Sequence, residues 1–336
     1  MSSKPGNSEN SLNWLLEPDD PGVRYLALRD LLGLPCDDPT LCDARKIAHE
    51  EGPISHVLNR MDPQGFWSKP GPGYGVKYRS TVWAIILLAQ LGASITEDQR
   101  IGLACNYLVD HAFAKGGKFT HAGSPSGTFD CLQGNLCWAL TELGYADPRL
   151  DEAYRWLSIS QTGDGVAPKT DKSAPVRYYA YKCGPGFLCG ANYNLPCAWG
   201  ATKVLMALGN LTAAKQTDQS RKATKLAVDF FFSVEPSTAA WPYKEILSKN
   251  WWKFGFPVFY NTDLLQVAEA LTAVGYGNDP RLAQTISLIR SKQDAQGRWP
   301  LEYDVSKKTW GNYGTLGAPN KWVTLRALRV LKEIKT

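Results

Sequence analysis

Apolar segments alternate with glycine-marked turns along the whole chain. An apolar segment ends at or just before each of Gly33, Gly92, Gly144, Gly209 and Gly275. Glycine tolerates the left-handed backbone that commonly follows the last turn of a helix. By subtraction, these glycines lie 59, 52, 65 and 66 residues apart, which is enough for two helices and a turn in each unit. The pattern therefore predicts a repeat of helical hairpins.

The segments on either side of each glycine differ in character. Those before it are apolar on most faces, which predicts inner helices, and those after it carry one apolar stripe, which predicts outer helices. The short segment 11–16 is the candidate for the last outer helix, unless that helix is absent. The expected inner helices are 23–32, 80–91, 129–143, 197–208, 260–274 and 321–334, and the outer ones are 41–60, 97–111, 150–159, 220–233 and 281–292.

The outer helices end in a recurring turn. Its clearest copy places Gln293, Gly297 and Trp299 in the spacing QxxxGxW, and partial copies occupy 161–167 and 61–67. The glutamine can bond free backbone groups at a helix end, the glycine allows the turn, and the aromatic ring covers it.

This turn resembles the QW repeat of squalene–hopene cyclases, which protein prenyltransferase β-subunits share more loosely. The phrases VRYLALRDLLG, YRSTVW, FGFPVFYNTDLL and NKWVTLRALRVLK also resemble uncharacterised bacterial prenyltransferase/squalene oxidase repeat-like proteins. The resemblance implies an all-α (α/α)6 toroid, with six inner helices ringed by about six outer ones. We expect one toroid domain over 11–336, preceded by a disordered segment 1–10. The fold does not specify the chemistry.

Composition narrows the partners. Lysine and arginine exceed aspartate and glutamate by 37 to 32, but the basic residues are dispersed in sequence, which argues against a nucleic-acid partner. The start MSSKPGNSENSLNW has no apolar signal region, and the most apolar run, 82–91, is too short to span a bilayer. These features predict a cytoplasmic protein without a transmembrane segment.

Geometry suggests where a site would lie. If every outer helix leads through such a turn into the next inner helix, the inner-helix N-termini share one face with the long connectors 160–196 and 234–259. We expect these connectors to cap a central cavity lined with aromatic residues. The alternative for Trp83, Trp199 and Trp322 is that they simply fill the centre of the ring. The expected substrate-binding residues are Arg79, Trp83, Asn135, Trp199, Lys203, Trp252, Phe256, Lys321 and Trp322.

Acid catalysis is the first candidate chemistry. Neither the DxDD motif of class II terpene cyclases nor the DDxxD motif of class I enzymes occurs. The best single acid is Asp263, whose pKa would be raised by neighbouring aromatic residues, with Tyr260 orienting the substrate. Arg79, Lys203 or Lys321 would hold an anionic end. The alternative for Asp263 is a carboxylate that bonds backbone N–H groups at a helix start.

The cysteines suggest a second chemistry. Cys131, Cys183 and Cys197 lie at inner-helix starts or in a connector, and three thiolates suit Zn²⁺. The toroid families that the chain resembles include zinc proteins, although neither the prenyltransferase nor the lanthipeptide-cyclase ligand motif is reproduced. Buried free thiols are the equally weighted alternative, and the only cofactor that we consider is zinc.

Nucleophilic hydrolysis is the third candidate. A couple of Cys131 and His121, assisted by Asp130, would suit cleavage of an ester or lactone. Our preferred interpretation is an enzyme that acts on a small, largely apolar, isoprenoid-like molecule. A metal-assisted or cysteine-dependent hydrolase and a non-catalytic toroid that binds a ligand or a protein remain alternatives.

Overall fold

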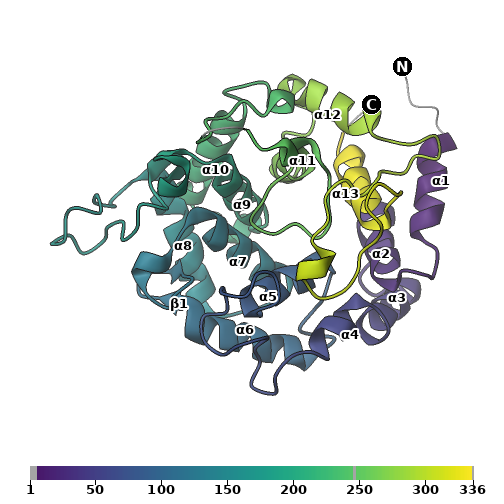
Figure 1. Cartoon of the computed structure of the whole chain (residues 1–336), viewed down its shortest axis with the longest axis horizontal. Helices are drawn as coiled ribbons and strands as arrows, with labels where there is room; N and C mark the ends of the chain where they lie inside the picture. Colours follow the sequence, from purple (N-terminus) through teal and green to yellow (C-terminus); the bar gives the residue numbers. More distant parts are fainter. Residues whose placement is uncertain (1–5, 245–246, 335–336) are drawn as a thin grey trace.

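The computed structural model describes residues 6–244 and 247–334, and it is mostly helical. Figure 1 shows the helices arranged as an inner and an outer ring. The coarse prediction of an all-α fold is therefore confirmed. The inner helices are α2 (Pro21–Leu26), which continues as the π-helical η1 (Ala27–Leu32), α5 (Thr81–Gln90), α7 (Asp130–Glu142), α9 (Ala198–Gly209), α11 (Leu264–Ala273) and α13 (Lys321–Lys332).

Contacts between consecutive inner helices close the ring. Helix α5 packs on α7, α7 on α9, α9 on α11 and α11 on α13, and α13 packs on α2 and η1. The last join is made where Gly92, after α5, meets Leu26 of α2. A Cβ atom on Gly92 would lie 2.6 Å from Leu26 Cδ2, and Gly92 also has a φ of +78°, so this position needs glycine for two separate reasons.

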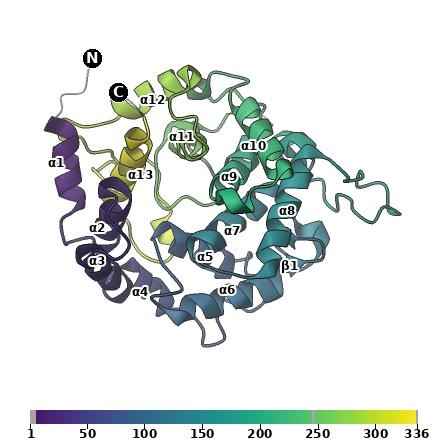
Figure 2. The ribbon, with the colours of Figure 1, turned by 180° about the vertical axis from the view of Figure 1, so that it is seen from behind.

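The outer helices each cover an inner one. Helix α3 packs on α2, α6 on α5, α8 on α7, α10 on α9 and α12 on α11. Helix α1 packs on α13, and Figures 1 and 2 show the two side by side from both sides of the ring. The outer elements are α1 (Gly6–Leu15), α3 (Pro39–Glu50), α4 (Pro53–Leu58), α6 (Gln99–Ala112), α8 (Pro148–Thr162), α10 (Asp218–Phe231) and α12 (Ala283–Ser291).

The N-terminal segment differs from its prediction. Residues 6–10, expected to be disordered, form the first part of α1, while 1–5 lie outside the described residues. The connectors contain two short antiparallel strand pairs. Phe113 faces Phe119 in β1 (Phe113–Ala114) and β2 (Lys118–Phe119), and Leu188 faces Pro196 in β3 (Leu188–Cys189) and β4 (Leu195–Pro196). No helix in the described ranges is both long and apolar enough to cross a membrane.

Aspartate–proline pairs start several outer helices. Asp147 accepts a hydrogen bond from the backbone N–H of Arg149, and Pro148 occupies the first turn of α8. The same arrangement starts α3 at Asp38 and Pro39. An aspartate satisfies a free N–H group there, and proline has the backbone angle that the first turn requires.

Tryptophans close the ends of the outer helices. The indole N–H groups of Trp67, Trp241 and Trp299 donate to the backbone carbonyls of Val57, Phe231 and Ile289, each ten residues earlier, at 2.9, 3.2 and 2.7 Å. The backbone N–H groups of Trp67 and Trp299 donate to threonine hydroxyls of the next inner helix, Thr81 and Thr324. Each of these two tryptophans thus joins the end of an outer helix to the following inner helix.

Replacing Trp299 with phenylalanine is expected to lower the free energy of unfolding by about 0.5–1.5 kcal/mol, because the buried Ile289 carbonyl keeps only the longer hydrogen bond from the Lys292 N–H, at 3.3 Å. Urea unfolding measures this change. Trp14→Phe is the matched control, since the Trp14 indole N–H makes no hydrogen bond to a described residue. Equal losses in the two variants would contradict the assigned role of the Trp299 hydrogen bond.

The connector before α11 enters the ring. Gln90 of α5 donates to the Val258 carbonyl and accepts from the Val258 N–H, both at 2.8 Å, and Asn135 of α7 donates to the Phe259 carbonyl at 3.3 Å. The ring of Phe259 stacks on Tyr78 and meets Trp83 edge-on. Backbone and aromatic rings therefore fill the centre of the toroid and divide its interior into two ends.

Candidate functional site

A cavity of about 270 Å³ lies at the N-terminal ends of α7 and α9, which we call the thiol cavity. It is on the face where the sequence predicts a site. The connector between α8 and α9, one of the two predicted capping loops, supplies part of its wall, although another part of that loop projects away from the ring (Figure 1). The cavity is lined by Tyr74, His121, Phe129, Asp130, Cys131, Lys182, Cys189, Ala191, Cys197, Trp199, Gly200 and Tyr260.

The wall of the thiol cavity is largely aromatic. The rings of Tyr74 and Phe129 meet edge-on with centroids 5.4 Å apart, and those of Trp199 and Tyr260 do so at 5.8 Å. The indole N–H of Trp199 is buried and has no hydrogen-bond partner in the described part of the chain. Such a wall suits a mostly apolar molecule with few polar groups.

Asp130 is the buried acid of this cavity. It occupies the first position of α7, with 5 % of its surface exposed. Its Oδ1 accepts a hydrogen bond from Gln161 Nε2 at 2.9 Å, whereas its Oδ2 has no partner among the residues described. Burial raises the pKa of Asp130 well above the usual aspartate range, and Gln161 offsets this only in part.

Gln161 is itself fixed from both sides. It belongs to the partial copy of the recurring turn at 161–167, and its Oε1 accepts from the Phe187 backbone N–H at 3.1 Å. Its Nε2 donates to Ser160 Oγ as well as to Asp130. Gln161, whose predicted role is to bond free backbone groups at a helix end, therefore also orients the Asp130 carboxyl group.

The thiol of Cys189 differs from the other thiols of the cavity. A hydrogen bond from Cys197 and the backbone N–H groups of Ala191 and Asn192 lower its pKa to about 6, against the opposing effect of burial. The same contact and burial raise the pKa of Cys197, and burial raises that of Cys131 to about 12. Cys189 is thus the thiol that is ionised most easily.

The three predicted zinc ligands do not all come together. Cys131 and Cys197 share the thiol cavity, but Cys183 does not line it and is buried with Trp156 and Tyr178. Across residues 6–244 and 247–334, no three His, Cys, Asp or Glu side chains are placed to hold a metal ion. The residues present therefore do not fit the zinc site proposed from the sequence.

His121 and Cys131 line the same cavity, as expected for a catalytic couple. The His121 ring contacts the rings of Tyr74 and Phe129, with centroids 5.8 and 5.9 Å away. No hydrogen bond links His121 to Cys131 in the described structure. Burial, assisted by the charge of Lys182, lowers the pKa of His121 and favours the neutral imidazole.

Alkylation is expected to identify the reactive thiol. At pH 7 iodoacetamide should modify Cys189 several-fold faster than the exposed Cys36, because a thiol with a pKa of about 6 is mostly thiolate. Peptide mass spectrometry after timed quenching gives both rates from one sample. A Cys189 rate at or below that of Cys36 would contradict the assignment.

The surroundings of Asp263 differ from the predicted ones. Asp263 precedes α11, and its Oδ1 accepts from the Gln266 backbone N–H at 2.7 Å. Arg326 of α13 donates to both carboxylate oxygens at 3.0 Å. A buried guanidinium, not an aromatic shell, therefore faces this carboxylate, and the contacts give Asp263 a structural role that matches the alternative interpretation.

The three basic residues predicted to hold an anion lie outside the thiol cavity. Arg79 is exposed and sits over the Trp310 ring, and Lys321 pairs with Glu17 and Asp19. Lys203 is fully buried, bonds Gln266 and the Asn261 carbonyl, and has a pKa that burial lowers to about 7.

The remaining predicted residues mostly fill space. Trp83 donates to the Tyr74 carbonyl, Trp322 stacks on Phe256 with centroids 4.4 Å apart, and Trp252 donates to the Ser237 carbonyl. Trp83 and Trp322 therefore match the alternative that these tryptophans fill the centre of the ring, whereas Trp199 lines the thiol cavity.

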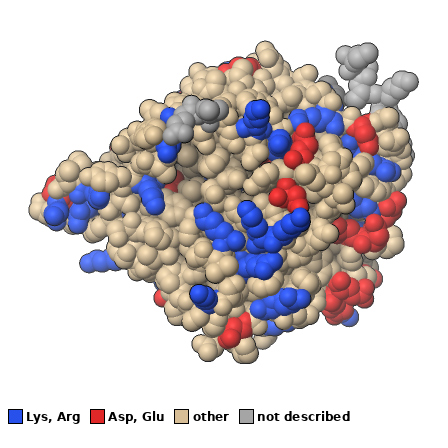
Figure 3. Space-filling model, viewed as in Figure 1, with Lys and Arg blue, Asp and Glu red and all other residues tan. Residues whose placement is uncertain are grey.

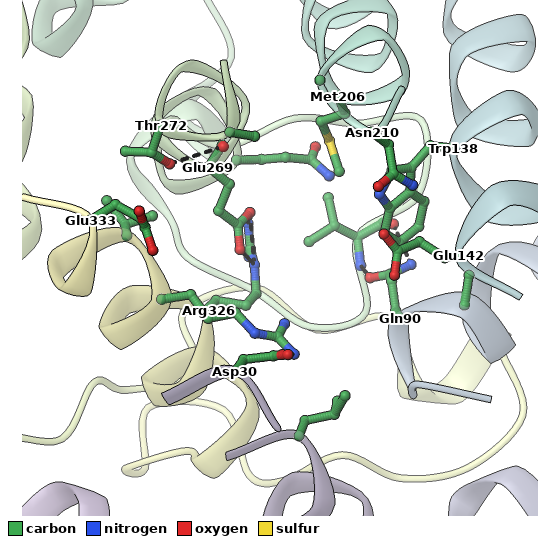
Figure 4. A pocket seen from close by; sticks show the side chains of 18 of the residues that line it. Asp30, Gln90, Trp138, Glu142, Met206, Asn210, Glu269, Thr272, Arg326 and Glu333 are labelled. Atoms are coloured by element: carbon green, nitrogen blue, oxygen red, sulfur yellow. Dashed lines mark hydrogen bonds and ion pairs between the residues drawn. The ribbon is translucent and has the colours of Figure 1, made fainter. Parts of the chain in front are cut away.

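A larger cavity of about 560 Å³ lies at the opposite end of the ring, and we call it the charged cavity (Figure 4). It is formed at the C-terminal ends of the inner helices and includes Asn135 and Phe256 from the predicted set. The predicted aromatic-lined cavity at the N-terminal face did not include this second cavity. Its ionisable lining residues are Arg29, Asp30, Glu142, Glu269, Arg326, Arg329, Lys332 and Glu333.

Two residues that line the thiol cavity, Cys189 and Lys182, were not among the predicted site residues. Cys189 closes the CGPGFLC stretch, and the spacing gave no reason to prefer it to Cys183. Lys182 directly precedes that stretch, and its Nζ lies 5.7 Å from the Phe129 ring centroid. Both reach the cavity through the fold of the connector between α8 and α9, which has no helical or strand period to interpret.

Basic residues that are dispersed in sequence gather on one face. Figure 3 shows lysines and arginines near the centre of the face seen in Figure 1, over the C-terminal connector. Arg60 and Arg79 both lie over Trp310, at 5.9 and 5.5 Å, and Lys77 Nζ lies 4.2 Å from the Tyr260 ring centroid. Lys77 thus places a positive charge against an aromatic residue of the thiol cavity.

No protein-family model and no curated protein matches the chain. Among solved structures, it is similar to the type II terpene cyclase MstE from Scytonema in complex with geranylgeranyl dihydroxybenzoate, with 11 % identity, a TM-score of 0.34, and coverage of 87 % of this chain and 95 % of that one. A protein from Actinoplanes is similar at 12 % identity and a TM-score of 0.32, over 87 % and 98 %. At these scores neither similarity bears on function.

Proposed function

We propose that the chain is an enzyme that converts a small, largely apolar molecule in the thiol cavity, with Asp130 as the proton donor. The observation that carries this proposal is the state of the Asp130 carboxyl group. It is buried at an aromatic cavity, one oxygen is fixed by Gln161, and the other has no partner in the described structure.

A raised pKa suits this role. Because burial disfavours the carboxylate, Asp130 keeps its proton at higher pH than an ordinary aspartate does. A neutral acid with an unpaired oxygen can protonate an oxygen-bearing group of a bound molecule, such as an epoxide or a carbonyl. In this proposal Asp130 replaces Asp263 as the acid, and Tyr260 orients the substrate.

Positive charge beside the cavity would hold a polar end of the substrate. Lys182 lines the cavity, and Lys77 contacts the faces of Tyr260 and Tyr74 at 4.2 and 5.2 Å. These lysines take the place of Arg79, Lys203 and Lys321 in the earlier expectation. The substrate that fits best has an apolar body and one anionic or strongly polar end, which includes isoprenoid-like molecules.

We interpret the two rings as an (α/α)6 toroid in which α1 is the outer partner of α13. In this interpretation the inner-helix N-termini supply Asp130 and Cys197, and the connector between α8 and α9 caps them.

A second candidate function is cysteine-dependent cleavage of an ester or lactone. The lowered pKa of Cys189 favours it, with Cys189 in place of Cys131 as the nucleophile. The Cys189 thiolate would attack the acyl carbon, the carbon–oxygen bond would break, and the leaving alkoxide would take a proton from water to become the alcohol. Water would then hydrolyse the thioester, releasing the acid and restoring the thiol.

Consumption of a compound from an apolar extract tests the proposed function. We expect the purified chain to deplete at least one compound of a bacterial lipid extract, as followed by mass spectrometry. In Ala191→Phe, a change at an exposed lining position, the added ring should block the cavity and abolish the depletion. Retention of a compound without conversion would favour the binding alternative, and depletion that survives in Ala191→Phe would place the chemistry elsewhere.

A further inference from the structure

The charged cavity is separate from the proposed active site. The segment that enters the ring passes between the two cavities, since Phe256 and Val258 line the charged cavity and Tyr260 lines the thiol cavity. An inference about the charged cavity therefore does not depend on the proposed function.

The arginines of the charged cavity are already engaged in ion pairs with carboxylates. Arg326 pairs with Asp263 at 3.0 Å and with Glu269 at 2.7 Å. Arg29 and Arg329 share the single carboxylate of Asp30, and Lys332 donates to the Asp30 backbone carbonyl. An anionic ligand would therefore compete with existing ion pairs for each of these guanidinium groups.

The carboxylate of Glu142 is in a different situation. Glu142 is only half-buried and lines the cavity, and it has no ion pair or hydrogen bond to any side chain in residues 6–244 and 247–334. Its charge is felt by Arg29, but Arg29 donates its own hydrogen bonds to Asp30. One negative charge in the wall thus lacks a direct partner.

Trp138 lies one helical turn before Glu142, so both project from the same side of α7. Figure 4 shows Trp138 and Glu142 next to Asn210 and Gln90 on one side of the cavity, facing Glu269 and Glu333 across it. Glu333 also has no ion pair in the described structure. A tryptophan beside an unpaired carboxylate suits an ammonium group by charge and cation–π attraction.

We infer that the charged cavity is a binding site for a small molecule that carries a protonated aliphatic amine, with Glu142 and Trp138 as its recognition residues. The ammonium group places a positive charge against the Glu142 carboxylate, which accepts hydrogen bonds from its N–H groups. A volume of about 560 Å³ accommodates a molecule longer than one amine group. Glu333 provides a carboxylate acceptor for a second amine at the other end.

Calorimetric titration with 1,4-diaminobutane and with 1,4-butanediol tests this inference, because the two probes have the same chain length and differ in charge. We expect the diamine to bind at least about tenfold more tightly than the diol, and to bind more weakly as salt is added. Equal affinities, or no detectable diamine binding, would overturn the inference.

Variants locate the binding. Glu142→Gln, which preserves shape and removes the charge, should weaken diamine binding at least about tenfold. Trp138→Leu should weaken it several-fold through loss of the aromatic face. The control is Glu152→Gln, an exposed glutamate on α8 outside the cavity, which should bind as the unchanged chain does. Unchanged affinity in Glu142→Gln with a normal thermal unfolding curve would contradict the site.

Discussion

Replacing Asp130 with asparagine is expected to reduce turnover in the thiol cavity by at least about 10²-fold, the usual contribution of a positioned general acid. Asparagine keeps the oxygen that accepts from Gln161, so the cavity wall and its ability to bind substrate should persist. The loss should therefore appear mainly in kcat, measured as the rate at which the depleted compound disappears.

Asp279→Asn is the matched control. Asp279 also stands at a helix start, where its side chain accepts from the Arg281 backbone N–H, but it lines neither cavity. Its turnover should remain within about twofold of the unchanged chain. Full activity in Asp130→Asn would remove Asp130 from the mechanism and favour the cysteine-dependent alternative.

The pH dependence of Asp130 follows from the direction of its pKa shift. Turnover should fall as pH rises through the raised pKa, because the proton donor is lost. The free energy of unfolding should also fall as pH rises. Between the pKa of Asp130 in the unfolded chain and its higher pKa in the folded chain, the folded state binds more protons than the unfolded state, so raising the pH destabilises the folded state. The melting temperature of Asp130→Asn, measured relative to that of the unchanged chain, should therefore increase as the pH rises above about 4.

Replacing Arg326 with methionine is expected to destabilise the fold by about 3–5 kcal/mol, because removal of one partner leaves buried carboxylates uncompensated. Arg326 pairs with Asp263 and Glu269 and also donates to the Gly255 carbonyl at 2.7 Å. It thereby ties α13 to α11 and to the segment inside the ring. Urea unfolding gives the free energy of unfolding.

A double variant separates charge from packing. In Arg326→Met combined with Asp263→Asn, the buried charge of Asp263 is gone while the asparagine can still accept from the Gln266 N–H at the start of α11. The double variant should recover part of the free energy of unfolding that is lost in Arg326→Met alone. A single-variant loss below about 1 kcal/mol would contradict the role assigned to the ion pairs.

The helical part of the fold could be predicted because its signals are local. The αL glycine at Gly33 and the Asp–Pro pair at Asp147 mark helix ends within a few residues of sequence. The Trp299 turn also has a local cause, since its indole bonds a carbonyl ten residues earlier. The prediction of disorder was wrong for residues 6–10, which belong to α1.

The site could be predicted only as far as the helix starts allowed. Asp130, Cys131 and Cys197 were placed on one face because inner helices begin there. Choosing between Asp130 and Asp263 required the partners of each carboxylate, and Arg326 is 63 residues from Asp263. An ion pair between residues this far apart in the chain produces no periodic pattern in the sequence.

The charged cavity escaped prediction for a related reason. It depends on the C-terminal ends of inner helices, whose polar residues, such as Glu142 and Glu269, read as ordinary solvated helix positions. The segment around Val258 then separates this end from the other one through hydrogen bonds to Gln90, 168 residues away. Neither the filled centre nor the two ends can be read from local patterns.

The most direct test of the central claim is protection of Cys189 by the compound that the chain consumes. In Asp130→Asn, where the compound should bind with turnover slowed by at least about 10²-fold, its saturating presence is expected to slow alkylation of Cys189 by iodoacetamide at least about tenfold, because substrate and thiol share one cavity. Alkylation of the exposed Cys36 in the same sample should not change. An unchanged Cys189 rate at saturation would show that the substrate binds elsewhere and would contradict the account.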